Sequence, residues 1–167
     1  NNRTCITTAK PAMHAPLLPE DHRLTPDNDP SPAPFGAFAP NAAQAAIISL
    51  AHRTRLKRGA FRPWLSRLVN LLRAGPVDVP YQGAAFRFYH QASATERGAL
   101  FNPAYNVEEL DFLRGHVPAG GVFVDVGANV GTYALALAHH VGAGGKVIAI
   151  EPHPVTHARL AFNNAAS

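Results

Sequence analysis

The stretch 122–152 constrains the fold of this 167-residue chain more than any other feature. Residues 122–126 form an apolar, β-branched run bounded by glycines, which is typical of a strand buried on both faces by helices in a parallel α/β sheet. A helical pattern follows over 132–141, and a second strand pattern follows over 146–150. Strand, helix and strand together have the length of a βαβ unit, about thirty residues, and a right-handed crossover makes the two strands parallel.

The turn between the first strand and the helix is rich in glycine. Gly127 and Gly131 permit torsions and close approaches that a side chain forbids, so we expect a sharp turn whose backbone amides point at whatever lies above the strand end. Glu151 directly follows the second strand, and the carboxyl ends of neighbouring parallel strands meet at one edge of a sheet. We therefore expect Glu151 beside this turn, where a carboxylate can accept hydrogen bonds from both hydroxyls of a ribose.

The glycine spacing separates two classes of nucleotide site. A dinucleotide fingerprint reads G-x-G-x-x-G, whereas Ala128-Asn129 stands here where the second glycine should fall. The spacing therefore disfavours a dinucleotide cofactor. An NAD-dependent oxidoreductase is nevertheless kept as the alternative function.

The D-x-G-x-x-x-G pattern from Asp125 to Gly131 is similar to that of class I S-adenosylmethionine-dependent methyltransferases. Residues 123–131 together with 147–152 resemble the FkbM family of these enzymes, and the resemblance is close over about 105–164. It implies a Rossmann-like α/β fold that binds S-adenosylmethionine, with Asp125 near the methionine end and Glu151 on the ribose. The expected cofactor-binding residues are Asp125, Gly127, Ala128, Asn129, Gly131, Glu151 and Tyr105.

The resemblance further implies O-methylation of a small molecule, a sugar or a natural-product hydroxyl. A hydroxyl acceptor must lose its proton to a base or a metal, and the sequence identifies neither.

His153 and His157 have the i, i+4 spacing of metal ligands, but no third ligand is in view, so we expect no metal site. No serine or cysteine stands in a nucleophile elbow, and we expect no nucleic-acid partner.

Three segments are predicted ahead of the cofactor-binding part, 122–167. Residues 1–40 contain eight of the fifteen prolines and no sustained periodicity, which predicts a disordered leader. Residues 41–76 are predicted to be helical, and residues 77–121 are predicted to form a hairpin, a looser stretch and a helix that leads into the catalytic domain.

Within the helical segment, Asn41 and Gln44 predict a capping box for a helix that runs to about Arg58. A second helix is predicted to open at Pro63, and its apolar face is expected to consist of Trp64, Leu65, Leu68, Leu71 and Leu72. The hairpin is predicted to turn at Gln82-Gly83, and the last helix to begin after Asn106.

The positive charge of the chain is concentrated between Arg53 and Arg73, where seven arginines and lysines occur without an acid. Such a stretch attracts anionic surfaces, and a solvated helix face is the alternative interpretation. A non-catalytic scaffold that binds an anionic surface through 53–73 is thus a further alternative function.

The sequence contains no apolar run of about 20 residues to span a bilayer, and the first thirty residues lack the apolar block of a signal peptide, so we expect a cytoplasmic location. The chain begins without methionine and ends just after a helical pattern. We therefore expect an N-terminal fragment of a methyltransferase, truncated after the second strand of the parallel sheet and inactive alone.

Overall fold

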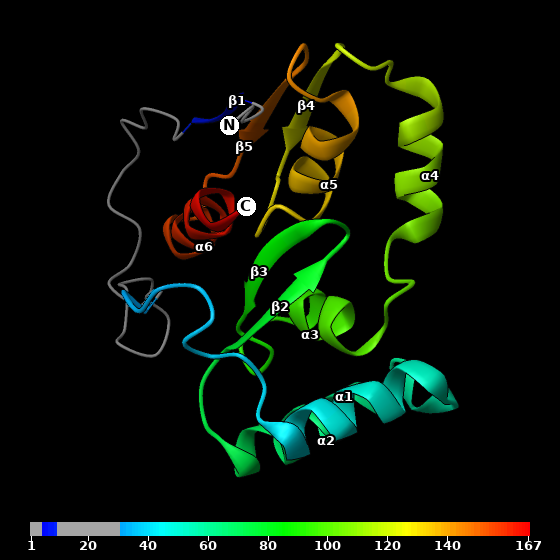
Figure 1. The fold of residues 1–167 in the computed structure, drawn as a ribbon, viewed down its shortest axis with the longest axis vertical. Coiled ribbons are helices and arrows are strands. Elements are labelled where there is room, and N and C mark those ends of the chain that lie inside the picture. The colour runs from blue at the N-terminus through cyan, green and yellow to red at the C-terminus, as the bar shows by residue number, and fades with distance from the viewer. Residues whose placement is uncertain (1–4, 10–30) are drawn as a thin grey trace. The chain divides into compact units, whose positions relative to one another are not determined.

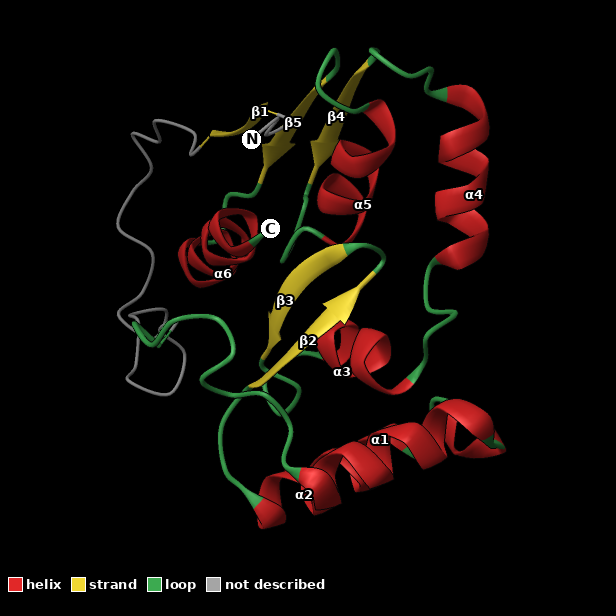
Figure 2. Ribbon diagram, viewed as in Figure 1, coloured by secondary structure: helices red, strands yellow, loops and turns green. Residues whose placement is uncertain are grey.

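The structure is a computed structural model that describes residues 5–9 and 31–167, with side chains from residue 31 onwards. It is an α/β protein with a three-stranded parallel sheet and a separate antiparallel hairpin (Figures 1 and 2). The predicted α/β class is therefore confirmed. The described residues divide into two compact units, one formed by those up to 32 with 112–165 and 167, the other by 33–111 and 166. Residues 41–76 and 77–111 both belong to the second unit, and the predicted division of the chain into segments stays a prediction.

The first unit is built on a βαβ unit, as predicted. Strand β4 (Val122–Val126) leads through helix α5 (Thr132–Val141) to strand β5 (Lys146–Ile150), and β4 and β5 are parallel, with Phe123 opposite Val147. Figure 1 shows α5 alongside both strands, and its leucines, Leu135 and Leu137, are buried. Helix α6 (Pro154–Ala166) follows β5.

The expectation that the first strand is buried on both faces is wrong. Val122, Val124 and Val126 are 50–76% exposed, whereas Val147 and Ala149 of the neighbouring strand are fully buried. The difference arises because successive side chains of a strand point to opposite faces of the sheet, and α5 packs against only one face. The three valines of β4, the edge strand in the order β1-β5-β4, lie on the other face.

The third strand, β1 (Cys5–Ala9), pairs in parallel with β5 and begins with Cys5 opposite Lys146. The prediction of a disordered leader is therefore wrong for these residues, which precede the first proline and include β-branched Ile and Thr. It is also wrong for 33–38, because Arg87 donates to the carbonyls of Ala33 and Pro34. Residues 1–4 and 10–30 of the predicted leader lie outside the described residues.

Helix α1 (Ala42–Arg53) opens the second unit with the predicted capping box. The Asn41 side chain accepts from the Gln44 backbone N–H at 2.9 Å, and the Gln44 side chain accepts from the Asn41 N–H at 3.1 Å. The helix ends before the predicted Arg58, because Thr54 adopts an extended conformation and caps a short 3-10 helix, η2 (Arg55–Lys57).

Helix α2 (Arg62–Leu72) begins near Pro63 as predicted, but of its predicted apolar face Leu65 is buried as expected and Trp64 and Leu71 are not. The helix packs through Leu65, Ser66 and Val69, whereas Trp64 is 66% exposed and Leu71 is 82% exposed. Ser66 takes a place on the buried face because its hydroxyl contacts Nδ1 of His90 at 2.8 Å.

The hairpin consists of β2 (Val77–Tyr81) and β3 (Ala84–Phe88) and turns at Gln82-Gly83, as predicted. Helix α3 (Ala94–Phe101) occupies the stretch that the sequence left irregular, and α4 (Val107–His116) follows it. Across the hairpin, Arg87 Nε lies 2.7 Å from Asp78 Oδ1 in an ion pair that is almost completely buried. None of the helices described here combines the length and apolarity required to cross a bilayer.

Candidate ligand site at the ends of β4 and β5

The turn between β4 and α5 has a backbone that only selected residues tolerate. Gly127, Asn129 and Gly131 all have positive φ, at 79°, 52° and 95°, a region open to glycine and accessible to asparagine. A Cβ on Gly131 would lie 2.6 Å from Leu160 Cδ1, whereas a Cβ on Gly127 would meet nothing within 4 Å. Gly131 therefore permits the packing of α6 against the turn, and Gly127 leaves open space beside it.

From the sequence we expected the backbone amides of the turn to point at whatever lies above the strand end. The structure shows that this is wrong. All five N–H groups of 127–131 donate to acceptors within the protein. Those of Gly127 and Ala128 both donate to the Ile150 carbonyl (2.8 and 3.0 Å), that of Asn129 to Glu151, that of Val130 to the Asn129 side chain and that of Gly131 to the Ala128 carbonyl. The turn is therefore hydrogen-bonded to the end of β5, and none of these five amides is free to bind an anion.

Glu151 lies against this turn. Its Oε2 accepts from the Asn129 N–H at 2.8 Å, and its Oε1 accepts from the His153 N–H at 2.8 Å. The side chain is 7% exposed, so the two amides hold a largely desolvated carboxylate in one orientation. A carboxylate offers about four acceptor positions, so further acceptor capacity remains on both oxygens. The structure thus brings Glu151 and the turn together, and its contact with a ribose stays a prediction.

Asp125 is the second acidic group of this site. Burial raises the pKa of its carboxyl, the negative charge of Glu151 raises it further, and the Ala134 backbone N–H acts in the opposite direction. Its Oδ2 is buried and has no hydrogen-bond partner within the described part of the chain. Two carboxyl groups that repel each other, one of them incompletely satisfied, form a site complementary to a positively charged ligand.

Tyr105 belongs to the other unit. Its ring lies against Gly98 of α3, and the Arg62 guanidinium lies 5.5 Å from the ring centroid. Its backbone carbonyl accepts a hydrogen bond from the Tyr81 hydroxyl. These contacts give Tyr105 a structural role, and its predicted role in cofactor binding stays a prediction.

Two contributors to the site escaped the sequence analysis. The His153 N–H is one, and its signal was present, because an acidic side chain readily accepts from the N–H two residues on. Asn163 is the other: its buried side chain donates from α6 to the Val130 carbonyl at 3.0 Å. No local pattern links residues so far apart, so the sequence held no signal for it.

The described side chains contain no group of three or more His, Cys, Asp and Glu residues able to hold a metal ion. No family model matches the chain, and neither the curated proteins nor the solved structures gave a significant match. The geometry of the β4–α5 turn and its two carboxyl groups is therefore the basis on which a function can be argued.

Proposed function

We propose that this chain binds S-adenosylmethionine at the β4–α5 turn, with the Rossmann-like fold of a class I methyltransferase. The observation that carries the proposal is the position of Glu151, held against the turn by the backbone of Asn129 and His153. The resemblance of Asp125 to Gly131, and of 147–152, to the FkbM family supports the same assignment.

Glu151 suits a ribose because its carboxylate is already oriented in the free protein. Two backbone donors fix the carboxylate, so little side-chain freedom remains to be lost when a ligand binds. The remaining acceptor positions match the adjacent hydroxyls of a ribose, which are both donors. A buried carboxylate also makes stronger hydrogen bonds than a solvated one.

The charge of the site favours S-adenosylmethionine over NAD. A dinucleotide brings a pyrophosphate, which is held by free backbone amides, and the amides of 127–131 are already bonded within the protein. Asp125 and Glu151 place negative charge where an anionic group would be repelled. S-adenosylmethionine instead carries a sulfonium and an ammonium group, and the unsatisfied Oδ2 of Asp125 is suited to a positive partner.

Bound S-adenosylmethionine supplies an activated methyl group. The described residues contribute binding and orientation: Glu151 holds the ribose, Asp125 attracts the methionine end, and Gly127 leaves the turn open to close approach. Holding two reactants in line is a large part of catalysis in a bimolecular transfer. The proposed acceptor is a hydroxyl of a small molecule, a sugar or a natural product, as the family resemblance implies.

Calorimetric titration of the chain with S-adenosylhomocysteine and with NAD tests the proposal. We expect the wild-type protein to bind S-adenosylhomocysteine more tightly than NAD, and Glu151→Ala to weaken this binding by at least about tenfold, because charge-assisted hydrogen bonds to the ribose are lost. Glu108→Ala, which removes an exposed carboxylate of α4, is the matched control and should bind as wild type does.

Three results would overturn the assignment: no binding of S-adenosylhomocysteine by the wild-type chain, equal binding by wild type and Glu151→Ala, or tighter binding of NAD. The last result would favour the oxidoreductase alternative. Circular dichroism of each variant separates a lost contact from a lost fold.

A further inference from the structure

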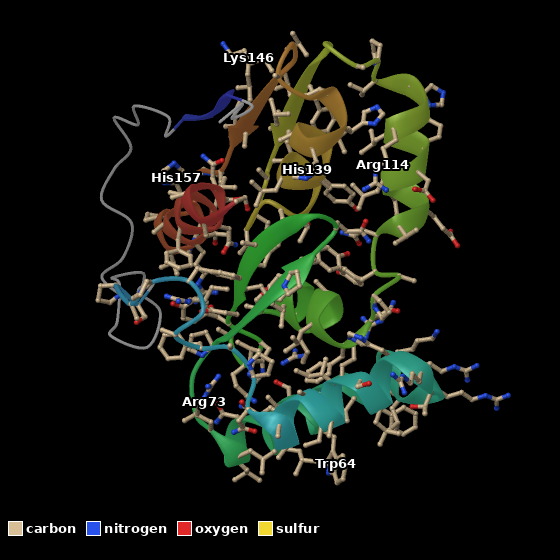
Figure 3. The ribbon with its side chains drawn as sticks, viewed as in Figure 1. Trp64, Arg73, Arg114, His139, Lys146 and His157 are labelled. Atoms are coloured by element: carbon tan, nitrogen blue, oxygen red, sulfur yellow. The ribbon has the colours of Figure 1, made fainter. Side chains whose placement is uncertain are left out.

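Helix α2 has two apolar faces, and only one of them is buried. Leu65 and Val69 pack inside the second unit, whereas Trp64 and Leu71 are 66% and 82% exposed. Trp64, Leu68 and Leu71 follow the i, i+4, i+7 spacing of a single helical stripe. Figure 3 shows Trp64 projecting outward from the α1–α2 helix pair. A large aromatic ring and a leucine thus stand in solvent on one line along the helix.

Basic residues flank this stripe along the chain. Seven arginines and lysines occur from Arg53 to Arg73, and no acid occurs among them. Two of the seven are engaged with the protein, because Arg62 donates to the Lys57 carbonyl and Arg73 donates to the carbonyls of Phe38 and Ala39. The others have exposed side chains at the end of α1, in and after η2, and on α2: Arg53, Arg55, Lys57, Arg58 and Arg67.

We propose that these residues form a surface that binds an anionic lipid membrane. The surface, here called the α2–η2 face, consists of Trp64, Leu68 and Leu71 with Arg53, Arg55, Lys57, Arg58 and Arg67. Interfacial helices combine these two elements: an apolar stripe with an aromatic residue that enters the headgroup region, and basic side chains beside it that attract anionic headgroups.

The exposed Leu71 and the half-buried Leu68 distinguish a membrane from the other possible partners. Arginines and an aromatic ring would also suit a nucleic acid, but RNA offers no apolar layer to accept Leu71 and Leu68. A second copy of the chain would cover the leucines, yet it would bring two sets of exposed cations together without any acid to balance them. An anionic bilayer accommodates both the apolar stripe and the charge.

The α2–η2 face contains none of the residues assigned to S-adenosylmethionine, so membrane binding and cofactor binding can be tested separately. Trp64 is the only tryptophan of the chain, and its fluorescence therefore reports on this face alone. The test uses the whole chain with phosphatidylcholine vesicles that contain or lack phosphatidylglycerol.

We expect the Trp64 emission to shift to shorter wavelength with the anionic vesicles and to be quenched by lipids brominated in the acyl chain. Neutral vesicles should leave the emission unchanged. Raising the salt concentration from about 0.05 M to about 0.5 M should reduce binding, because it screens the attraction between the cations and the lipid headgroups.

Two variants should weaken binding to anionic vesicles by at least about tenfold in cosedimentation: Leu71→Ser, which removes an inserted group, and Arg55→Ser/Lys57→Ser/Arg58→Ser, which removes charge near the surface. The matched controls lie outside the α2–η2 face. Phe112→Ser removes an exposed aromatic ring of α4, Lys146→Ser removes an exposed cation of β5, and both should bind as wild type does.

Several results would overturn the proposal. One is an unchanged Trp64 emission with anionic vesicles at low salt. Another is binding that the charge variant loses and Leu71→Ser keeps, together with displacement by an RNA oligonucleotide, which would indicate a nucleic-acid surface. The third is self-association in sedimentation that buries Trp64 without lipid and is lost in Leu71→Ser. A thermal unfolding curve for each variant shows whether its fold is intact.

Discussion

The backbone N–H of Asn129 donates to Oε2 of Glu151 across 2.8 Å and thereby joins the turn after β4 to the end of β5. The same carboxylate accepts from the His153 N–H through its other oxygen. One side chain therefore fixes the turn, the exit of β5 and its own orientation. If Glu151 also binds a ligand, the ligand meets a group that needs no rearrangement, and changes at Glu151 act on both structure and binding.

The two glycines of the turn should respond differently to substitution by alanine. Gly131→Ala introduces a Cβ 2.6 Å from Leu160 Cδ1 at a φ of 95°, so we expect a loss of about 2–4 kcal/mol in the free energy of unfolding from combined strain and overpacking. Gly127→Ala meets no atom within 4 Å, so only the positive φ is costly, at about 1 kcal/mol.

Among folded variants, Gly127→Ala should weaken ligand binding more than Gly131→Ala does, although it is the less destabilising of the two. The Cβ of Gly127→Ala enters the open space beside the turn, and we expect it to weaken S-adenosylhomocysteine binding by about tenfold or more through steric exclusion. Urea denaturation and calorimetry measure the two effects. Wild-type affinity in Gly127→Ala would show that the ligand does not approach this residue.

Asp125 should make the free protein less stable as the pH rises. Its folded-state pKa lies above the ordinary value of 3.8, so the folded state holds the proton more tightly than the unfolded state does. The resulting stability is fully present below 3.8 and is lost as the pH rises through the folded pKa. At neutral pH the isosteric variant Asp125→Asn should therefore be more stable than wild type.

Asp125→Asn should also bind S-adenosylmethionine more weakly, because the negative charge that attracts the cationic ligand is gone. Denaturation curves across this pH range, paired with titrations of the ligand, measure both changes. A variant that is both less stable and fully competent in binding would contradict the electrostatic role given to Asp125.

His90 should confer a second pH dependence, in the second unit. Burial lowers the pKa of its imidazole to about 4 from 6.5, the charge of Arg97 lowers it further, and a backbone hydrogen bond involving Gly75 opposes the shift. The group is fully buried, and its Nδ1 lies 2.8 Å from the Ser66 hydroxyl. The unfolded state therefore binds the proton more readily than the folded state does.

The stability that depends on neutral His90 is present above pH 6.5 and falls as the pH drops from 6.5 towards 4. The loss should reach about 3 kcal/mol, given about 1.4 kcal/mol for each pH unit of the shift. The difference in unfolding free energy between wild type and His90→Gln isolates this contribution. A difference that does not vary with pH would show that His90 accepts its proton in the folded protein without cost.

Removing one partner of the buried ion pair between Asp78 and Arg87 should lower the free energy of unfolding more than replacing both partners. Arg87 donates to both carboxylate oxygens of Asp78, at 2.7 and 2.9 Å, and the same guanidinium donates to the carbonyls of Ala33 and Pro34. Arg87→Met leaves the buried carboxylate of Asp78 without its positively charged partner, so we expect the free energy of unfolding to fall by about 3–5 kcal/mol. In Arg87→Met/Asp78→Leu no charge is left unpaired, and the loss should be smaller. A double variant less stable than Arg87→Met would contradict this account.

The sequence predicted the elements that depend on local chemistry. The βαβ unit followed from apolar runs and glycines at 122–150, and the capping box followed from Asn41 and Gln44, which lie three residues apart. The proximity of Glu151 to the turn followed from chain geometry, since parallel neighbouring strands end at one edge.

The features that the sequence did not predict depend on contacts between distant residues. Ser66 occupies the buried face of α2 because His90 provides a partner, whereas Trp64 lies on the exposed face. Helix α3 contains Gly98, which reads as a helix breaker but makes room for the Tyr105 ring. The amides of the β4–α5 turn bond to Ile150 and Glu151, two partners that only the folded sheet brings within reach.

The most direct test of Glu151 as the ribose-binding group compares S-adenosylhomocysteine with its 2′-deoxy analogue on wild type and on Glu151→Ala. Wild type should bind the analogue at least about tenfold more weakly, because a charge-assisted hydrogen bond is lost, and Glu151→Ala should bind the two ligands equally. Equal discrimination by the two proteins would show that Glu151 does not contact the ribose, and the assignment of this site to S-adenosylmethionine would be wrong.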